Sequence, residues 1–238
     1  MKIVKVNNHT LINADCLDAM EYLISIGTKV DAIITDPPYN IARDNNFDSM
    51  GRRGIDFGEW DKGFDITGWL KYIPKLLKED GSVVIFNDWK NLGTIARALE
   101  QLDFDIKDMI RFVKTNPMPR NRDRRYITDY EVALWAVPKN AKWVFNRINP
   151  NYERPEFIDN IEREQVHPTQ KPVSLMQHLI RIHSNEAHTI LDPFMGSGTT
   201  GVACQKDDRN FIGIEIDPNY FEIARVRVKT ESQQTNLF

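Results

Sequence analysis

The most constraining feature of this sequence is an alternation of short apolar runs with segments whose apolar residues recur at helical spacing. Short continuous runs that end in polar or glycine-containing turns are typical of strands buried on both faces of a parallel sheet. The runs are residues 30–35, 82–86, 189–191 and 210–214, and the helical segments are residues 65–78, 90–102, 199–206 and 219–229. This alternation predicts an α/β fold, with a doubly wound, mostly parallel sheet and helices on both faces.

Composition limits the class of protein. The 238 residues are 41% hydrophobic and 27% charged, as in globular rather than disordered chains. No apolar stretch approaches the roughly 20 residues that cross a bilayer, and the N-terminal residues lack the apolar core of a signal peptide. The two cysteines, Cys16 and Cys204, are too few for a disulfide framework or a zinc site. We therefore expect a reduced, cytoplasmic protein with no membrane partner.

Two long polar segments interrupt the alternation. Residues 40–63 contain four glycines, and residues 115–171 are rich in proline, asparagine and arginine around an apolar run at 132–137. Loops of this length in a compact domain are usually functional or mobile. We expect a single domain over residues 1–238, in which residues 40–63 form a mobile loop.

A glycine-containing turn at residues 192–200 (DPFMGSGTT) lies between a predicted strand and a predicted helix. Gly196 and Gly198 would let the backbone approach a ligand, and the helix N-terminus offers free N–H groups. Glu215 follows Gly198 by 17 residues, at the end of the next strand, where nucleotide-binding folds hold ribose hydroxyls. The third glycine of the dinucleotide fingerprint is missing, which favours an adenosine-bearing ligand other than NAD. An ordinary tight turn with a structural glutamate is the alternative.

A second turn, DPPY at residues 36–39, follows the strand at 30–35 directly. Pro37 and Pro38 lack an N–H group and have a fixed φ, so the turn is rigid and its carbonyls are free to accept. The Asp36 carboxylate and the Pro37 carbonyl suit a planar amino group with two N–H donors, and Tyr39 could stack on the ring that carries it. The alternative is a turn that only stops a strand.

Together these motifs carry a resemblance to a known family. DPPY at 36–39, followed by DPFMGSG at 192–198, resembles the S-adenosylmethionine-dependent DNA amino-methyltransferases, and the catalytic-first order resembles their β-class. HPTQKP at 167–172 looks like the remaining cofactor segment of that family. FGEWD at 57–61 and NPMPRN at 116–121 resemble a small subgroup of it. The resemblance covers most of the chain and implies the methyltransferase fold with permuted motif order.

The resemblance implies two sets of site residues. The catalytic set is Asp36, Pro37, Pro38 and Tyr39, and the cofactor set is Asp15, Asp36, Thr169, Lys171, Asp192, Phe194, Gly196, Ser197, Gly198, Thr199 and Glu215. In this family Phe194, Gly196 and Gly198 would line the methionine part of S-adenosylmethionine. Glu215 would hold the ribose hydroxyls. The residues 115–165 would form an inserted target-recognition region within one catalytic domain.

Besides Glu215, three residues of the cofactor set lie outside the two turns. For two of them, a role without a ligand is the alternative. The family pattern implies that Asp15 bonds the adenine amino group of the cofactor, but an aspartate there could also be a helix N-cap before residues 17–23. Thr169 and Lys171 would cap the cofactor from the other side, and Lys171 could instead be a solvated surface charge.

The implied reaction is methyl transfer to an exocyclic amine of a base flipped out of duplex DNA. Two acceptors, at Asp36 and Pro37, would pull the N–H bonds out of the base plane and localise the nitrogen lone pair. Asp36 would then stabilise the positive charge that the amine gains near the transition state. No metal and no covalent enzyme intermediate are needed. An Asp at position 36 favours adenine by family association, whereas either amine satisfies the physics.

One segment concentrates positive charge in a chain whose net charge is −3. Residues 111–125 contain six basic residues and one acidic residue, and arginine suits phosphate and guanine contacts. We expect this loop to bind DNA, with three further arginines after the catalytic motif closing over the base. The expected DNA-binding residues are Arg111, Lys114, Arg120, Arg122, Arg124, Arg125, Arg43, Arg52 and Arg53. A solvated surface is the alternative.

Several functional alternatives stay open. The main prediction is a site-specific DNA adenine 6-amino methyltransferase that uses S-adenosylmethionine. The nearest rival is a DNA cytosine 4-amino methyltransferase, and another is a DNA-binding subunit without turnover. An oxidoreductase with a dinucleotide fold is disfavoured by the missing glycine. The family resemblance also permits a homodimer and a cognate restriction endonuclease as partner.

Overall fold

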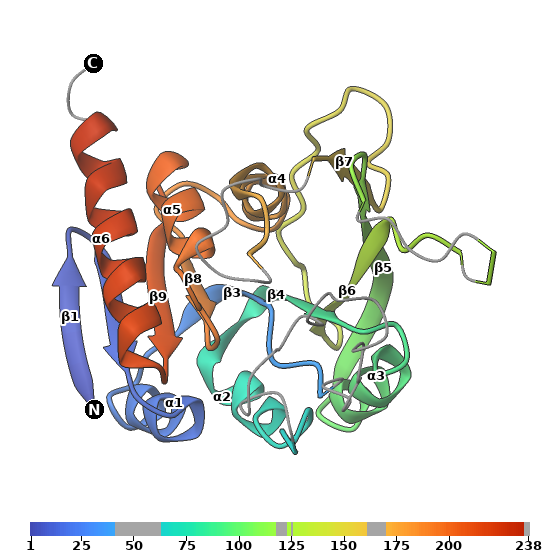
Figure 1. Cartoon of the computed structure of the whole chain (residues 1–238). Helices are drawn as coiled ribbons and strands as arrows, with labels where there is room; N and C mark the ends of the chain where they lie inside the picture. The colour runs from blue at the N-terminus through green and yellow to red at the C-terminus, as the bar shows by residue number, and fades with distance from the viewer. Residues whose placement is uncertain (41–62, 118–122, 125, 161–169, 236–238) are drawn as a thin grey trace.

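The computed structural model describes residues 1–40, 63–117, 123–124, 126–160 and 170–235. These residues form one nine-stranded sheet with helices on both of its faces (Figure 1). The strands are β1 (Lys2–Val6), β2 (His9–Asn13), β3 (Val30–Thr35), β4 (Leu77–Asn87), β5 (Phe104–Lys114), β6 (Tyr130–Pro138), β7 (Glu156–Asp159), β8 (Thr189–Asp192) and β9 (Asn210–Glu215). The helices are α1 (Cys16–Ser25), the 3-10 helix η3 (Leu70–Tyr72), α2 (Ile73–Leu76), α3 (Leu92–Glu100), α4 (Val173–His183), α5 (Thr199–Lys206) and α6 (Pro218–Thr235).

The strand order places distant parts of the chain side by side. The order across the sheet is β1-β2-β9-β8-β3-β4-β6-β5-β7. The five adjacent strands β2, β9, β8, β3 and β4 run parallel to one another, so their carboxyl ends meet at one edge of the sheet. The pairs β1–β2, β4–β6 and β5–β6 are antiparallel. The predicted mostly parallel α/β sheet is therefore confirmed, with antiparallel pairs near both edges that the sequence did not indicate.

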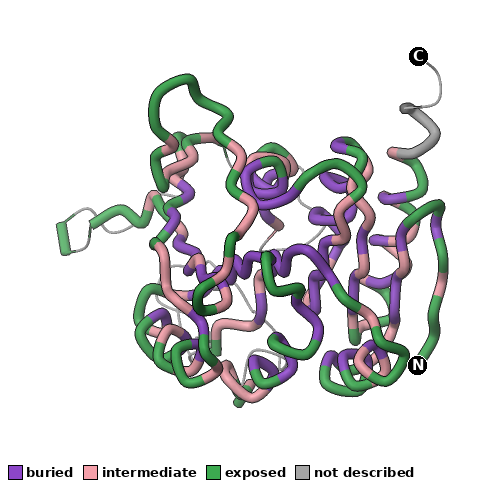
Figure 2. Tube along the Cα trace, turned by 180° about the vertical axis from the view of Figure 1, so that it is seen from behind, coloured by how far each residue is buried: buried purple, intermediate pink, exposed green. Residues whose placement is uncertain are grey.

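An apolar core lies on each face of the sheet, between the strands and the helices. One core packs α1, α2 and α3 against the sheet, below it in Figure 1, and its largest fully buried side chain is Trp69. The other packs α4, α5 and α6 against the opposite face around Phe86, Phe112, Phe211 and Phe221. Figure 2 shows the buried backbone concentrated in the central strands, with exposed backbone at β1 and in the long connections. Burial on both faces explains why β3 is apolar throughout.

The prediction of one helix over residues 65–78 is wrong. Residues 66–69 form turns, η3 and α2 together cover only 70–76, and β4 already begins at Leu77. Pro74, at the start of α2, lacks the N–H that would continue the preceding turn. The turn signal at Asp80-Gly81 likewise lies inside β4, within an irregularity where Val30 pairs with Leu77 but Ala32 pairs with Ser82. β4 therefore has extra residues opposite β3, and the polar residues of the turn signal lie among them.

The other predicted elements are confirmed with shifted ends, and five elements were not predicted, among them the short strand β7. Strand β3 and helix α5 have the predicted bounds. The unpredicted elements are β1, β2, β5, β7 and α4. Strand β5 matters most for the site because it places Arg111 and Lys114 in the sheet rather than in the expected loop. No helix of the described residues is long and apolar enough to cross a membrane.

Candidate active site

The candidate site is built from four adjacent strand ends. Asp15 follows β2, Glu215 ends β9, residues 192–198 end and follow β8, and residues 36–39 follow β3. These strands are neighbours in the sheet although the chain separates them by up to about 200 residues. In open α/β sheets, ligands bind outside the carboxyl ends of the strands. The structure therefore brings the two predicted motifs to one edge.

The DPPY turn presents the Asp36 carboxylate with its side chain 18% exposed. The Tyr39 hydroxyl donates to Asp36 Oδ1 at 2.6 Å. Burial, followed by the charge of Asp36, raises the pKa of Tyr39 well above its usual value, so the phenol stays protonated and remains a donor. Asn91 Nδ2, from the residue before α3, donates to the Tyr39 carbonyl at 2.8 Å. The turn is thus fixed by prolines within and by an amide from outside.

Lys171 lies against the Asp36 carboxylate rather than on the surface. Its Nζ donates to Asp36 Oδ2 at 2.5 Å, and its side chain is only 6% exposed. The same ammonium lies 2.8 Å from Glu131 Oε2 on β6 and 5.6 Å from the centre of the Tyr39 ring. The alternative of a solvated surface charge is therefore wrong. The structure links Lys171 to the DPPY turn, and its predicted contact with the cofactor stays a prediction.

Asp192 at the end of β8 is buried, with 3% exposure, and is held by protein groups on both oxygens. Oδ1 accepts from the Thr35 hydroxyl at 2.7 Å and from the Phe194 N–H at 3.1 Å, and Oδ2 accepts from the Thr200 hydroxyl at 2.6 Å. Burial raises the pKa of Asp192 to about 6 despite these donors. Because Thr35 immediately precedes Asp36, the Asp192 carboxylate connects the loop after β8 to the DPPY turn.

The two glycines of the loop after β8 serve different purposes. Both have positive φ, +52° at Gly196 and +80° at Gly198. A Cβ on Gly196 would meet nothing within 4 Å, whereas one on Gly198 would lie 2.8 Å from the Ala224 Cβ on α6. Gly196 therefore leaves open space at the site, and Gly198 permits close packing of α5 on α6. The sequence predicted that both glycines let the backbone approach a ligand. At Gly198 the close approach is instead to the neighbouring helix α6.

The polar residues of this loop are anchored to α6 and to the segment before α4. Arg227 on α6 donates to the Ser197 carbonyl at 2.7 Å and to the Ser197 hydroxyl at 2.9 Å, and it approaches the Thr199 hydroxyl at 3.4 Å. The Ser197 hydroxyl also lies 3.4 Å from Gln170 Oε1. These contacts hold the loop in shape, and the predicted cofactor contacts of Ser197 and Thr199 stay predictions.

An aromatic cluster borders the same loop. The Phe194 ring makes edge contacts with Phe64 at 5.5 Å and with Trp69 at 5.3 Å between ring centres. Trp69 is buried, and its Nε1–H has no hydrogen-bond partner among the residues that the structure describes. A buried donor without an acceptor is uncommon in folded proteins. Phe194 therefore lies beside an apolar wall with one unused donor.

The two acidic residues at the edge of the cofactor half have local partners as well. Asp15 is the N-cap of α1, and its Oδ1 accepts from the Leu17 N–H at 2.8 Å, as the alternative interpretation expected. Glu215 accepts from the Gly196 N–H at 2.9 Å and from the Asp217 N–H at 2.8 Å. Burial raises the pKa of Glu215 above its usual value. A cap leaves further lone pairs on each carboxylate, so the predicted ligand contacts stay predictions.

The predicted DNA-binding patch is only partly described. Arg111 and Lys114 lie in β5 and are paired, Arg111 with Glu156 at 2.7 Å and Lys114 with Glu131 at 2.5 Å. The expectation of a loop is wrong for these two, because a strand with local ion pairs replaces it. Arg124 is described and exposed. The other predicted DNA-binding residues, Arg43, Arg52, Arg53, Arg120, Arg122 and Arg125, and the predicted cofactor residue Thr169, lie outside the described residues.

Three residues of the site were not found from the sequence. Glu131 comes from β6 and Asn91 from the turn before α3, so neither belongs to a motif that lies near residues 36–39 in the chain. Arg227 lies on α6 among other charged residues. Only the fold places these side chains beside the motifs, and no local spacing marks them. The structure shows no cluster of three or more potential metal-ligating side chains among the residues it describes.

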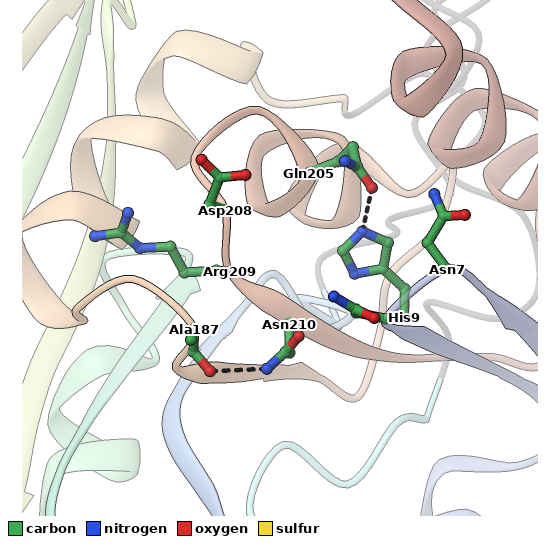
Figure 3. A pocket seen from close by; sticks show the side chains of 8 residues that line it. Asn7, His9, Ala187, Gln205, Asp208, Arg209 and Asn210 are labelled. Atoms are coloured by element: carbon green, nitrogen blue, oxygen red, sulfur yellow. Dashed lines mark hydrogen bonds between the residues drawn. The ribbon is translucent and has the colours of Figure 1, made fainter. Parts of the chain in front are cut away.

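A separate cavity of about 150 Å³ lies at the opposite end of the parallel strands (Figure 3). Its lining includes Asn7 from the β1–β2 turn, and Asn210, the first residue of β9. His9 is hydrogen-bonded to Gln205 at 2.7 Å, and Asn210 Nδ2 donates to the Ala187 carbonyl at 2.7 Å. It is smaller than known small-molecule sites, which occupy about 300–1,000 Å³. Because it lies at the amino ends of the parallel strands, the cavity is distinct from the candidate active site at their carboxyl ends.

The fold and the site together define an α/β enzyme that presents a carboxylate acceptor beside a glycine-containing ligand loop, which is the arrangement of amino-methyltransferases. A family model described as DNA methylase, for N6 and N4 methyltransferases, matches residues 30–226. The chain therefore belongs to this DNA methylase family, and the predicted family resemblance is confirmed.

Relatives and solved structures agree with this assignment. The type II methyltransferase M2.DpnII of Streptococcus pneumoniae is 33% identical over 225 residues, which are 86% of this chain and 84% of the relative. The crystal structure of the M1.HpyAVI–SAM complex shares 43% identity and a TM-score of 0.78, covering 92% of this chain and 99% of that one. The cytosine-N4-specific PvuII DNA methyltransferase, at 17% identity, 98% and 92% coverage and a TM-score of 0.72, shows the shared fold.

Proposed function

We propose that this DNA methylase transfers a methyl group from S-adenosylmethionine to the 6-amino group of an adenine that is flipped out of duplex DNA. The observation that carries the proposal is the partly exposed Asp36 carboxylate at the end of β3, one hydrogen bond away from the loop after β8 through Thr35 and Asp192. An amine acceptor and a ligand loop on adjacent strands are what such a transfer requires, because proximity and alignment supply much of the rate.

The residues at the adjacent strand ends fit the proposed cofactor. Gly196 leaves open space beside its backbone, and Trp69, next to the Phe194 ring, offers a buried N–H that pairs with none of the described residues. Glu215 and Asp15 offer carboxylate acceptors for the hydroxyl and amino donors of an adenosine moiety. When bound, S-adenosylmethionine supplies an electrophilic methyl group. The M1.HpyAVI relative was solved in complex with SAM, which supports the same ligand here.

Asp36 has the chemistry to activate the amine. The lone pair of an exocyclic amine is delocalised into the base, which makes the amine a weak nucleophile. Acceptors at the Asp36 carboxylate and the Pro37 carbonyl would draw the two N–H bonds out of the base plane. The carboxylate would also stabilise the positive charge that the nitrogen gains, and a fixed acceptor does so without reorganisation at the moment of reaction. The Tyr39 hydroxyl orients Asp36 through Oδ1.

The choice of adenine rests on the family pattern. Aspartate before the two prolines is associated with the adenine amine and serine with the cytosine amine, and this chain has Asp36. The PvuII enzyme, which is named cytosine-N4-specific, shares only the fold at 17% identity. Either amine could meet Asp36 and Pro37, so the product must be measured to distinguish the two.

The partners proposed beyond DNA follow from the relatives. M2.DpnII is named a type II methyltransferase, and we extend that setting to this chain: a site-specific enzyme in the bacterial cytoplasm, beside a cognate restriction endonuclease. A homodimer is part of the proposal and is tested by light scattering during gel filtration. Arg124 is an exposed, described member of the predicted DNA patch that lies outside β5. We expect Arg124→Gln to weaken DNA binding and to reduce the slope of log affinity against log salt by about 1.

The first experiment is nucleoside mass spectrometry. Unmethylated bacterial DNA is incubated with the protein and methyl-labelled S-adenosylmethionine, digested and analysed, with Asp36→Asn as the matched control. We expect labelled 6-methyladenine from the wild type and about 10³-fold less from the variant. A 4-methylcytosine product would overturn the choice of base. Absence of labelled product, with cofactor binding intact, would contradict the proposed activity and favour a DNA-binding subunit without turnover.

A further inference from the structure

The catalytic carboxylate ends a row of alternating charges that begins on β5. Lys114 Nζ lies 2.5 Å from Glu131 Oε1, Glu131 Oε2 lies 2.8 Å from Lys171 Nζ, and Lys171 Nζ lies 2.5 Å from Asp36 Oδ2. The four formal charges cancel, and the Tyr39 hydroxyl completes the row at Asp36 Oδ1. Lys114 lies on β5 and Glu131 on β6, and Asp36 directly follows β3. We call these residues, 114, 131, 171 and 36, the charge row.

The inner members of the charge row are held in their charged forms. Burial alone would lower the pKa of Lys171, but the charges of Asp36 and Glu131 outweigh it and raise that pKa. Burial alone would raise the pKa of Glu131, but Lys171 and Lys114 lower it to about 2. A buried charge is tolerated only when it is paired in this way. Each inner residue therefore depends on a partner at both of its ends.

The position of the Lys171 ammonium is set by what surrounds it. Lys171 Nζ donates to Asp36 Oδ2 and lies within ion-pair distance of Glu131 Oε2, while the Tyr39 hydroxyl lies 3.4 Å away. The ammonium also sits 5.2 Å from the centre of the Phe86 ring. Without the Glu131 charge, the buried ammonium would have Asp36 as its single counter-ion. It would then neutralise the carboxylate that, by the proposed function, must attract a developing positive charge.

We propose that Glu131 is a positioning residue for methyl transfer and that Lys114 acts through it. By sharing Lys171 with Asp36, Glu131 keeps one ammonium from fully neutralising the catalytic carboxylate and fixes the orientation of that carboxylate. Lys114 balances Glu131 from the far side, so that Glu131 stays available to Lys171. This inference rests on the proposed role of Asp36 and assigns Lys114 a task other than the DNA contact expected from its charge.

The test compares single-turnover methylation by the wild type, Glu131→Gln, Glu131→Asp, Lys114→Gln and the Glu131→Gln/Lys114→Gln double variant. Glutamine keeps the shape of Glu131 and removes its charge. We expect Glu131→Gln to lower the single-turnover rate about 10- to 100-fold, as loss of an outer partner does at other sites. The KM values for DNA and cofactor should stay within about twofold. Glu131→Asp should recover part of the rate, because it restores the charge.

Lys114 distinguishes the positioning role from DNA binding. If Lys114 acts through Glu131, Lys114→Gln lowers the rate without changing the salt dependence of DNA binding, and the double variant is no slower than Glu131→Gln alone. If Lys114 contacts phosphate, the variant raises the KM for DNA and reduces the salt slope. The second pattern would overturn the part of the proposal that concerns Lys114.

A matched control separates positioning from general loss of stability. Asp31 is another buried carboxylate, on the same strand that leads to Asp36, and its Oδ1 is paired with Lys78 at 2.6 Å. Asp31→Asn should lower the thermal unfolding temperature but leave the single-turnover rate per bound cofactor unchanged. A wild-type rate in folded Glu131→Gln, beside an inactive Asp36→Asn, would overturn the inference and leave the proposed function intact. Inactive wild type would contradict the proposed function itself.

Discussion

Two Asp-Pro turns follow adjacent parallel strands in this enzyme, and their aspartates have opposite surroundings. Asp192 after β8 is 3% exposed and bonded to two hydroxyls and one backbone N–H. Asp36 after β3 has an 18% exposed side chain and is bonded to a lysine ammonium and a phenol. The same dipeptide thus supports structure at one strand end and, by the proposed function, chemistry at the next. The two aspartates differ in their partners, which are neutral donors at Asp192 and a buried ammonium at Asp36, and in the exposure of the carboxylate itself.

The largest expected effect is on activity at the accessible aspartate. Asp36→Asn should lower the methylation rate by about 10³-fold, because the amide cannot stabilise a developing positive charge as a carboxylate does. The fold should persist, since Lys171 keeps Glu131 as a counter-ion. Rapid-quench methylation and thermal unfolding measure both properties. Substantial activity in Asp36→Asn would erase the functional difference between the two turns.

At the buried aspartate we expect an effect on stability that depends on pH. The pKa of Asp192 is about 6 in the folded protein, above the usual value of 3.8 for an aspartate. A raised pKa means that the folded state binds the proton more tightly, so the stability from this group is full below about pH 4 and is lost as pH rises through 6. The integrated effect is about 3 kcal/mol.

Asp192→Asn should remove that pH dependence. An asparagine can still accept from Thr35 and Phe194 and can donate to the Thr200 hydroxyl, so the variant keeps the hydrogen bonds. Urea unfolding between pH 4 and 7 gives the free energy of unfolding for both proteins. Parallel curves for wild type and variant would show that Asp192 does not titrate in this range.

A smaller loss is expected from one of the hydroxyls that hold Asp192. Thr200→Val removes the donor to Asp192 Oδ2 and leaves a buried acceptor without its partner, which costs about 1–3 kcal/mol of unfolding free energy. The matched control is Thr189→Val, at the half-buried start of β8, the strand that ends at Asp192. Equal stability of the two variants would argue that the Thr200 bond adds nothing to the cofactor loop.

The smallest effect separates the two glycines. Alanine at either position must adopt a positive φ, which costs about 1–2 kcal/mol. Gly198→Ala also places a Cβ 2.8 Å from Ala224, so it should lose about 1 kcal/mol more than Gly196→Ala by urea unfolding. Gly196→Ala should instead weaken S-adenosylmethionine binding in calorimetry. The reverse order of stabilities would contradict the assignment of Gly198 to helix packing.

The sequence predicted those parts of the molecule in which local pattern and function coincide. β3, α5 and both turns were found because buried strands and glycine turns have local signatures. β5 was missed because charged residues alternate within it, so that Arg111 and Lys114 resemble a loop patch when their partners Glu156 and Glu131 are unknown. Glu131 could not be assigned at all, because its meaning depends on β6 lying between β4 and β5.

The hydrogen bond from Thr35 to Asp192 spans 157 positions of the chain but only one step across the sheet. Neighbouring strands lie about 4.8 Å apart, and this spacing varies little because the backbone ladder sets it. The alignment of the two turns is therefore inherited from the sheet itself and owes nothing to the order of the motifs along the chain. A sequence cut and rejoined elsewhere would keep the same alignment, provided that β3 and β8 still pair.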